Sequence, residues 1–318
     1  MSDKMPRQVI FDCDPGIDDA VALSMGLFDP RLDVVAVTAT AGNVPADQAS
    51  RNVQAIVEQL DPVRFPRLGS ATPPEQCSGL SATYLHGEDG LGNAGIAVSR
   101  LHHQHPSEKV ISDAVRAAPH RVTIVCLGPL TNIARAFQRD PELPSLVDRI
   151  VMTGGAINGI GNVTAAAEFN MFFDANSARA VFQCPMTKTL IPLDVTRTLK
   201  FTLDFLDQIP RESTRVGAFL TRILPFYYRV YHQQLGQESV FLHDVIALAA
   251  VLEPELFEFK EMAGDVETRG DLTLGTTVFD RRPNLRWRPN MDVAVGMDRK
   301  RVLGLIVKSL ALGGSATG

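Results

Sequence analysis

The chain has 318 residues, a formal net charge of −5 and 45% hydrophobic residues. This length suits one large α/β domain or two smaller ones, and the composition is that of an ordinary enzyme. Without a block of Lys or Arg, the chain lacks the basic face that nucleic-acid binding needs. No apolar run reaches the roughly 20 residues of a membrane helix, and the polar N-terminus lacks a signal-peptide core. Four scattered cysteines without a CxxC pair predict a reduced, cytoplasmic protein.

Strands and helices alternate through the first 200 residues. Short apolar runs rich in β-branched residues predict strands at 8–13, 32–40, 121–127, 149–155 and 188–194. Helical spacing predicts helices between them, at 18–28, 47–60, 128–138 and 174–183. This alternation indicates βαβ units, so we expect an α/β fold with a mostly parallel, Rossmann-like central sheet flanked by helices.

Beyond residue 200 the chain is mainly helical. The segment 213–235 predicts a long helix that bends or breaks at Pro225, and a short helix follows at 243–252. Strands are predicted at 272–280 and 291–297, and Asp298 is expected to cap a closing helix. Without a long linker, we expect one domain over residues 1–312, with extra helices in its C-terminal half and a disordered tail at 313–318.

Polar segments follow five of the predicted strands: "DCDPGIDD", "TAGN", "CLGPLTN", "MTGG" and "PLDVT". In a parallel sheet, ligands bind outside the carboxyl ends of the strands. Asp, Asn, Thr and Gly are also common in ordinary turns. Five such ends at one edge nevertheless favour a polar ligand site there.

The first of these segments carries four carboxylates within eight residues: Asp12, Asp14, Asp18 and Asp19. Helix N-termini attract acidic residues, which accounts for one or two of them. A hard cation accounts for the whole set, because Ca²⁺ takes six to eight oxygen ligands, and the absence of His and Cys disfavours zinc. Asp244 at the start of an apolar helix offers a second donor region, although His243 and Asp244 also suit an N-cap.

The motif "DCDPGIDDA" resembles the signature of the nucleoside hydrolases, the inosine-uridine-preferring N-ribohydrolase family. Seven further segments follow in the family's order over nearly the whole chain: "TAGN", "HGEDGLG", "GPLTNIA", "AEFN", "LDVT", "HD" and "LTLGTTV". The resemblance implies Ca²⁺-dependent hydrolysis of the N-glycosidic bond of ribonucleosides, which gives ribose and a free purine or pyrimidine base. It also implies a homodimer or homotetramer.

The resemblance further assigns residues to the metal and to the sugar. The metal ligands would be the side chains of Asp14, Asp19 and Asp244 and the backbone carbonyl of Leu127. The ribose would be bound by five residues, with Met152 beside the sugar: Asp18, Asn43, Asn162, Glu168 and Asn170.

For the base, the resemblance places His243 nearby and His86 in a segment that resembles a mobile lid. Tyr227 and Tyr231, four residues apart on one helical face, resemble tyrosines that approach the base. Tyr228 is the rival assignment, and packing in the core or lid is the alternative for all three.

The expected chemistry gives these groups roles. Asp14 is the candidate general base, because a carboxylate beside a metal-bound water can take its proton. Glu168 would stabilise positive charge on the ribose. His243 is the candidate donor to the leaving base, since His titrates near neutral pH, and His86 is the second candidate.

Two other functions fit parts of the pattern. Asp12 and Asp14 have the spacing of haloacid-dehalogenase-type phosphatases, in which the first carboxylate is a nucleophile beside Mg²⁺, but the later motifs have no role there. A non-catalytic nucleoside- or ribose-binding protein is the second alternative, against which the occupied catalytic positions argue. The sequence leaves the preferred base open.

Overall fold

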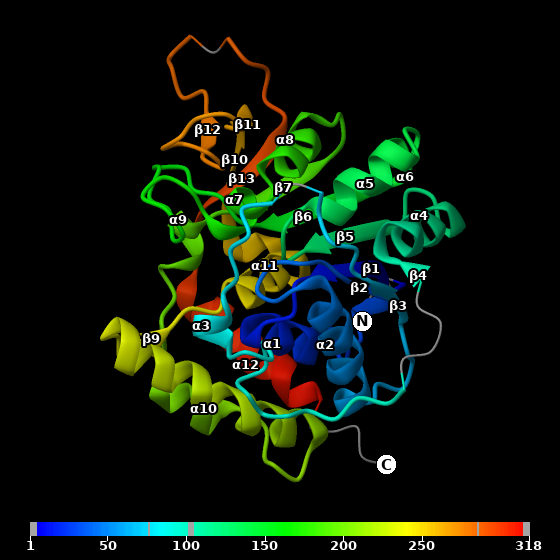
Figure 1. Ribbon diagram of the computed structural model, residues 1–318, viewed down its shortest axis with the longest axis vertical. Helices are drawn as coiled ribbons and strands as arrows, with labels where there is room; N and C mark the ends of the chain where they lie inside the picture. Colours follow the sequence, from blue (N-terminus) through cyan, green and yellow to red (C-terminus); the bar gives the residue numbers. More distant parts are fainter. Residues whose placement is uncertain (1–4, 76, 101–104, 285, 314–318) are drawn as a thin grey trace.

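The computed structural model describes residues 5–75, 77–100, 105–284 and 286–313, and it confirms the α/β prediction (Figure 1). In these residues, nine strands form one sheet in the order β10-β13-β7-β6-β5-β1-β2-β3-β4. All neighbours are parallel except β10 and β13. The strands are β1 (Arg7–Cys13), β2 (Leu32–Ala39), β3 (Arg67–Ser70), β4 (His105–Pro106), β5 (Val122–Cys126), β6 (Arg149–Thr153), β7 (Lys188–Ile191), β10 (Phe257–Met262) and β13 (Met291–Met297).

Helices cover both faces of the sheet (Figure 1). One face carries α1 (Ile17–Gly26), α2 (Ala46–Leu60), α10 (Arg215–Leu235), α11 (His243–Leu252) and α12 (Arg299–Leu312). The other carries α4 (Ser107–Ala117), α5 (Thr131–Arg139) and α8 (Ala175–Gln183). Side chains of β1 alternate between the two apolar clusters, with Phe11 in the first and Ile10 in the second. Burial on both faces explains the continuous apolar runs of the central strands.

Shorter elements complete the described chain. They are α3 (Thr83–His86), α6 (Leu143–Leu146), α7 (Phe169–Phe173), α9 (Leu193–Thr196), β8 (Phe201–Thr202), η1 (Leu203–Gln208), β9 (Ser239–Val240), η2 (Pro254–Leu256), β11 (Gly264–Val266) and β12 (Thr277–Phe279). No helix in the described ranges is both long and apolar enough to cross a membrane.

The strand order reverses between β1 and β5. From β1 the chain moves outward through β2, β3 and β4, then returns to the other side of β1 at β5 and continues to β6 and β7. At such a switch point the loops after the two strands diverge and open a crevice for ligands. Asp14 follows β1 directly and Leu127 follows β5, so both flank this crevice.

Two predicted elements differ from the structure, and one detail is confirmed. The helix α10 continues through Pro225, so the predicted break is absent; Pro225 lies on the exposed face of the helix, where water can satisfy the freed carbonyl. The strand predicted at 272–280 shrinks to β12, since Gly275 turns the chain with a φ of +74°. Asp298 caps α12 as predicted, accepting the N–H of Arg301 at 3.1 Å. Most of the predicted tail, 314–318, lies outside the described residues.

Candidate active site

A cavity of about 620 Å³ opens at the carboxyl ends of the central strands. Its walls come from the loops after β1, β2, β5 and β6, together with α3, α10 and the start of α11. The structure brings twelve of the fourteen predicted site residues to this cavity: Asp14, Asp18, Asn43, His86, Leu127, Asn162, Glu168, Asn170, Tyr227, Tyr231, His243 and Asp244. The prediction of a polar site at converging strand ends thus agrees with the geometry.

Four carboxylates meet at the crevice between β1 and β5. Oxygens of Asp18, Asp19 and Asp244 lie within 4.8 Å of one another, and Asp14 lines the same cavity. Burial raises the pKa of each carboxyl, and repulsion from neighbouring carboxylates adds to the effect for Asp14, Asp18 and Asp244. One oxygen each of Asp18 and Asp19 has no hydrogen-bond partner in the described structure. Buried, unpartnered oxygens at this spacing fit a hard cation.

Backbone groups shape the position of Asp14. Its Oδ2 accepts the N–H of Asn43 at 2.8 Å. Gly42 and Gly128 pack so closely on the carboxylate that a Cβ at either position would clash with it. The glycines of "TAGN" and "CLGPLTN" therefore make room for this carboxylate between two strand ends.

Glu168 and Asn170 each hydrogen-bond the backbone through one polar atom of the side chain. Glu168 caps α7, and its Oε2 accepts the N–H of Gly155 at 3.0 Å and that of Met171 at 3.2 Å. The amide of Asn170 donates to the Leu127 carbonyl at 2.8 Å. That carbonyl, the predicted metal ligand, keeps a second lone pair. The remaining oxygen of each side chain is therefore oriented in advance for a ligand hydroxyl.

The two other predicted ribose residues are also anchored. Asn43 donates its amide to the backbone carbonyl of Asp14 at 3.0 Å and to Oδ2 of Asp19 at 3.4 Å, so it joins two loops of the carboxylate cluster. Asn162 accepts the N–H of Phe169 through Oδ1 at 2.8 Å. This contact leaves the Asn162 amide group as a hydrogen-bond donor for a ligand.

His86 fastens α3 to the first turn of α1. Its Nδ1 accepts the N–H of Ile17 at 3.0 Å and lies 4.0 Å from a carboxylate oxygen of Asp18. The imidazole stacks on Tyr227 with ring centroids 5.3 Å apart. Burial, with a smaller effect of His243, lowers the pKa of His86 to about 3, so the ring is neutral at pH 7. Because Nδ1 accepts, its proton lies on Nε2.

Two of the three candidate tyrosines line the cavity. Tyr227 and Tyr231 share one face of α10, with hydroxyl oxygens 3.4 Å apart. Tyr227 also donates to the carbonyl of Phe241 at 3.3 Å. Tyr228 lies elsewhere and donates to the carbonyl of Thr202 in β8 at 3.0 Å. The geometry therefore favours Tyr227 and Tyr231 over Tyr228 as residues that approach a ligand.

His243 begins α11, next to Asp244. Its Nδ1 lies 2.7 Å from Oγ1 of Thr196, and its ring stacks on Phe241 with centroids 5.9 Å apart. Burial, with a smaller effect of Arg197, lowers the pKa of His243 to about 4. The imidazole is therefore neutral at pH 7. When the Thr196 hydroxyl donates to Nδ1, the ring carries its proton on Nε2 and can donate from there.

Met152, Asp19 and Asp12 do not line the cavity. Met152 is fully buried in β6, within the apolar cluster on the α5 and α8 side. Asp19 belongs to the carboxylate cluster but is itself fully buried. Asp12 is buried beneath the cavity, where its Oδ1 accepts hydrogen bonds from the hydroxyl of Thr38 at 2.6 Å and from the side-chain amide of Asn132 at 2.8 Å. A carboxylate enclosed in this way is not free to attack a ligand, which argues against the phosphatase alternative.

The sequence analysis did not identify several residues that line the cavity: Tyr84, Phe169, Arg197, Gln237 and Phe241. Most of them lie in loops or at the ends of short elements, where no period of two or 3.6 marks a side chain as inward-facing. Arg197 is the only Lys or Arg among the described residues that line the cavity.

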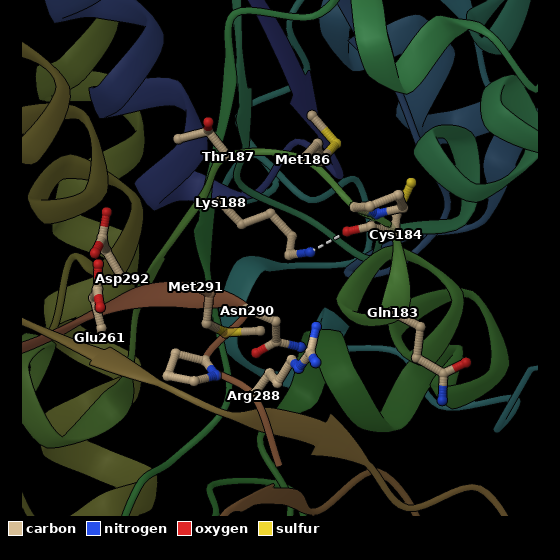
Figure 2. Close-up of a pocket in the computed structure, with 12 residues that line it drawn as sticks. Gln183, Cys184, Met186, Thr187, Lys188, Glu261, Arg288, Asn290, Met291 and Asp292 are labelled. Carbon is tan, nitrogen blue, oxygen red and sulfur yellow. Dashed lines mark hydrogen bonds between the residues drawn. The ribbon is translucent and has the colours of Figure 1, made fainter.

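A second hollow, of about 470 Å³, lies at the amino ends of β7 and β13 (Figure 2). Figure 2 shows the buried Lys188 donating its ammonium to the carbonyl of Cys184. The amide of Asn290 is occupied by the carbonyls of Phe182 and Gly264. This hollow contains none of the predicted site residues, and it lies at the opposite end of β7 from the carboxylate cluster.

Comparisons with known proteins agree with one another. The family model described as "Inosine-uridine preferring nucleoside hydrolase" matches residues 9–304. The chain is 35% identical to the pyrimidine-specific ribonucleoside hydrolase RihA of Shewanella sp. (strain MR-7), with 97% of each chain covered.

Solved structures give the same result. A plant nucleoside hydrolase, the PpNRh1 enzyme, superposes with a TM-score of 0.89 at 31% identity, over 96% of this chain and 99% of the other. A purine-preferring ribonucleoside hydrolase from Gardnerella vaginalis superposes with a TM-score of 0.89 at 30% identity, over 98% and 100%.

Proposed function

Because the chain belongs to the inosine-uridine preferring nucleoside hydrolase family, and is therefore an enzyme, we propose that it hydrolyses the N-glycosidic bond of ribonucleosides with a bound Ca²⁺. The products are ribose and a free base. One relative is named as pyrimidine-specific and one structural neighbour as purine-preferring, so the proposal covers both base classes.

The carboxylate cluster carries this proposal. Three buried carboxylates within 4.8 Å of one another repel strongly, and two of their oxygens lack partners in the described structure. The set contains oxygen donors alone, which suits Ca²⁺. We propose Asp14, Asp19, Asp244 and the Leu127 carbonyl as ligands, and Asp18 lies close enough to join them or to hold a ribose hydroxyl. When bound, the cation would make a water molecule more acidic.

The residues of the chain then divide the work. Asp14 takes the proton of the attacking water as general base, with its carboxylate fixed by the N–H of Asn43. Glu168, Asn170 and Asn43 hold the ribose hydroxyls, and the negative charge of Glu168 stabilises the developing positive charge on the sugar. The aromatic side of the cavity, with Tyr227 and Tyr231, holds the base.

His243 faces the leaving base in this proposal. Thr196 orients its ring through Nδ1, which leaves Nε2–H to donate a hydrogen bond to the base as the bond breaks. His86 instead holds α3 against α1 and helps to close the cavity around the ribose.

A ribose-release assay tests the proposal. We expect the purified protein with Ca²⁺ to release reducing sugar from at least one of inosine, adenosine, uridine and cytidine. Elemental analysis should find about one calcium per chain. Binding of nucleosides without ribose release would favour the binding-protein alternative, and full activity in verified metal-free protein would contradict the role of calcium. Asp244→Asn should lose both calcium and activity.

We also propose a cytoplasmic homodimer or homotetramer. The four cysteines are unpaired in the described structure, as expected for a reducing compartment. Light scattering of the purified protein would measure its mass, and a monomer would contradict the oligomer proposal.

A further inference from the structure

The buried side chain of Asn52 joins two loops of the candidate active site. Asn52 lies in α2 and is 2% exposed. Its Nδ2 donates to the backbone carbonyl of Asp89 at 2.8 Å and to that of Pro15 at 3.2 Å. Its Oδ1 accepts the side-chain amide of Gln48 at 2.8 Å, which fixes the orientation of the group. Both hydrogens of the Asn52 amide therefore hold backbone carbonyls, one from each loop.

The first loop is residues 14–19, which we call the carboxylate loop. Pro15 follows Asp14 directly, and Gly16 leads into α1. Oδ2 of Asp19 accepts the N–H of Gly16 at 2.8 Å, so the loop is folded back on one of its own carboxylates. Because Pro15 and Gly16 lie between Asp14 and Asp19, the position of the Pro15 carbonyl affects the spacing of two proposed calcium ligands.

The second loop is the segment of residues 82–92, which includes α3. It contributes four of the residues that line the cavity: Ala82, Tyr84, Leu85 and His86. Hydrogen bonds inside the segment give it a defined shape, and the N–H of Gly92, for example, donates to the carbonyl of His86 at 2.7 Å. Its contacts with the rest of the chain decide whether the segment stays closed over the cavity.

The 82–92 segment rests directly on the carboxylate loop. Nδ1 of His86 accepts the N–H of Ile17 at 3.0 Å. Gly90 packs so closely that a Cβ there would lie 2.8 Å from Nδ2 of Asn52 and 3.0 Å from the carbonyl oxygen of Pro15. The Asn52 amide thus fills the junction between the two loops and satisfies a carbonyl of each.

We propose that Asn52 is a positioning residue that couples the 82–92 segment to the carboxylate loop, so that calcium binding and closure of the segment favour each other. This inference rests on the calcium site of the proposed function and deepens it by naming what controls access to the cavity. Carboxylates that share a cation hold their loop in one arrangement, which presents the Pro15 carbonyl and the Ile17 N–H to the segment. The coupling is reciprocal, because closure must raise calcium affinity by the factor by which calcium favours closure.

A competing explanation is that Asn52 only stabilises the fold. Asn290 offers a matched control, because its Nδ2 also donates to two backbone carbonyls, those of Phe182 at 3.0 Å and Gly264 at 2.9 Å. Asn290 lines the second hollow, which shares no lining residue with the active-site cavity. Leucine has nearly the shape of asparagine but no donor, so Asn52→Leu and Asn290→Leu each remove one such bridge without changing the charge.

Amide hydrogen exchange measures the coupling without any turnover. In the wild type, we expect excess Ca²⁺ to slow exchange in residues 83–92 by about tenfold relative to metal-free protein, within the usual range for coupled sites. This segment contains none of the proposed ligands. In Asn52→Leu the slowing should fall below about threefold, while α11, which carries Asp244, should still respond to calcium. Asn290→Leu should keep the wild-type response.

Calcium affinity and steady-state kinetics give two further readouts. By calorimetric titration, Asn52→Leu should bind calcium several-fold more weakly than the wild type, and Asn290→Leu should bind it equally well. With calcium saturating, Asn52→Leu should raise KM for a cleaved nucleoside about tenfold and change kcat by less than about threefold. The segment lines the cavity, whereas the proposed general base and metal ligands lie outside it.

An undiminished calcium response of residues 83–92 in Asn52→Leu would overturn the inference, as would the same loss in Asn290→Leu. If Asn52→Leu does not fold, Asn52→Ser decides, because its hydroxyl offers one donor for two carbonyls and must also lose the coupling. A wild type that releases ribose without calcium-dependent protection of the segment would overturn the inference and leave the proposed function standing. A wild type that shows the protection but releases no ribose would overturn the proposed hydrolysis and support the coupling.

Discussion

At the scale of single residues, the cavity is lined by side chains that use one polar atom to hydrogen-bond the backbone and leave another free for a ligand. Glu168 and Asn170 each keep one oxygen for a ligand, while their other atoms bind N–H or carbonyl groups. Such anchoring fixes a side chain before the ligand arrives, and it lowers the entropy that binding costs. The sequence analysis identifies these two residues as site candidates through the family resemblance. It could not predict the groups that anchor them, because those partners are mostly backbone groups of other loops.

Asp14→Asn should abolish turnover while the protein stays folded. The amide cannot take a proton from water, and losing a general base typically costs 10²–10⁴-fold in rate. The rate, the calcium content and the Tm of the variant should be measured together, since loss of metal alone would also stop turnover. Asp47→Asn, an exposed carboxylate in the first turn of α2, serves as the control. Near-normal kcat in Asp14→Asn would exclude Asp14 as the base.

His243→Ala should lower the rate on inosine far more than on a nitrophenyl riboside, by about 10²–10³-fold in the ratio. The ring is neutral at pH 7 and stacked on Phe241, so its contribution is an oriented hydrogen bond. His243→Gln, whose amide reaches as far as Nε2, should recover part of the loss. Calcium content needs checking because Asp244 is adjacent. Equal losses on both substrates with metal retained would mean that His243 only positions the substrate.

At the scale of elements, the alternation of strands and helices was predictable because buried parallel strands are continuous apolar runs. That the five polar segments meet at one edge of the sheet was also predictable, because parallel strands place their carboxyl ends on the same side. The strand predicted at 272–280 was too long. The alternating apolar residues that predicted it extend over a turn at Gly275 as well as over β12. Arg197 and Phe241 were missed because loop residues follow no period that marks their direction.

Lys188 is a buried charged residue at the start of a central strand. It begins β7, is 2% exposed, and its ammonium donates to the Cys184 carbonyl, which also accepts the N–H of Met186. Burial lowers the pKa of Lys188 below its usual value. The unfolded chain therefore binds more protons, and stability falls as pH decreases through the unfolded pKa towards the folded one.

Lys188→Met should therefore stabilise the protein at pH 7. The thioether chain fills the same space without a charge, and replacing a buried charge by a fitting apolar group is worth on the order of 1 kcal/mol. Urea unfolding should show this gain at pH 7, and the gain should shrink at pH 10 and above as the wild-type lysine loses its proton. Lys260→Met, on the exposed face of β10, should have little effect. A loss of stability at pH 7 would show that the ammonium contributes favourably.

At the scale of the whole molecule, the position of the carboxylates follows from strand order. The sheet reverses between β1 and β5, and the crevice there receives Asp14 from one strand end and the Leu127 carbonyl from the other. Packing of α11 against α1 adds Asp244 from a distant part of the chain. The fold thus concentrates negative charge in its interior, and its stability should depend on what neutralises that charge.

Removal of metal should make the stability depend steeply on pH. Burial, with repulsion from a neighbouring carboxylate for Asp18, raises the pKa of Asp18 to about 8, and burial raises that of Asp19 to about 6. A folded pKa above the unfolded value means that these carboxyls contribute stability below the unfolded pKa of 3.8. That contribution is lost progressively as pH rises from the unfolded pKa of 3.8 through the folded values, and the loss is complete only above about pH 8. Metal-free protein should therefore have a Tm that falls from pH 5 to pH 8.

Calcium should reverse this fall, because the cation replaces the protons that the carboxylates lose. At 100 times its Kd, a ligand adds about 2.7 kcal/mol, which for a chain of this size is about 5 °C in Tm. The measurement is a set of thermal melts at pH 5, 6, 7 and 8 with chelator, with excess Ca²⁺ and with excess Mg²⁺. Asp244→Asn carries one charge fewer, so its metal-free form should melt higher than metal-free wild type at pH 8 and respond little to calcium. A metal-free Tm that does not change with pH would show that the carboxylate cluster is neutralised without a cation, and the calcium site would then have to be placed elsewhere.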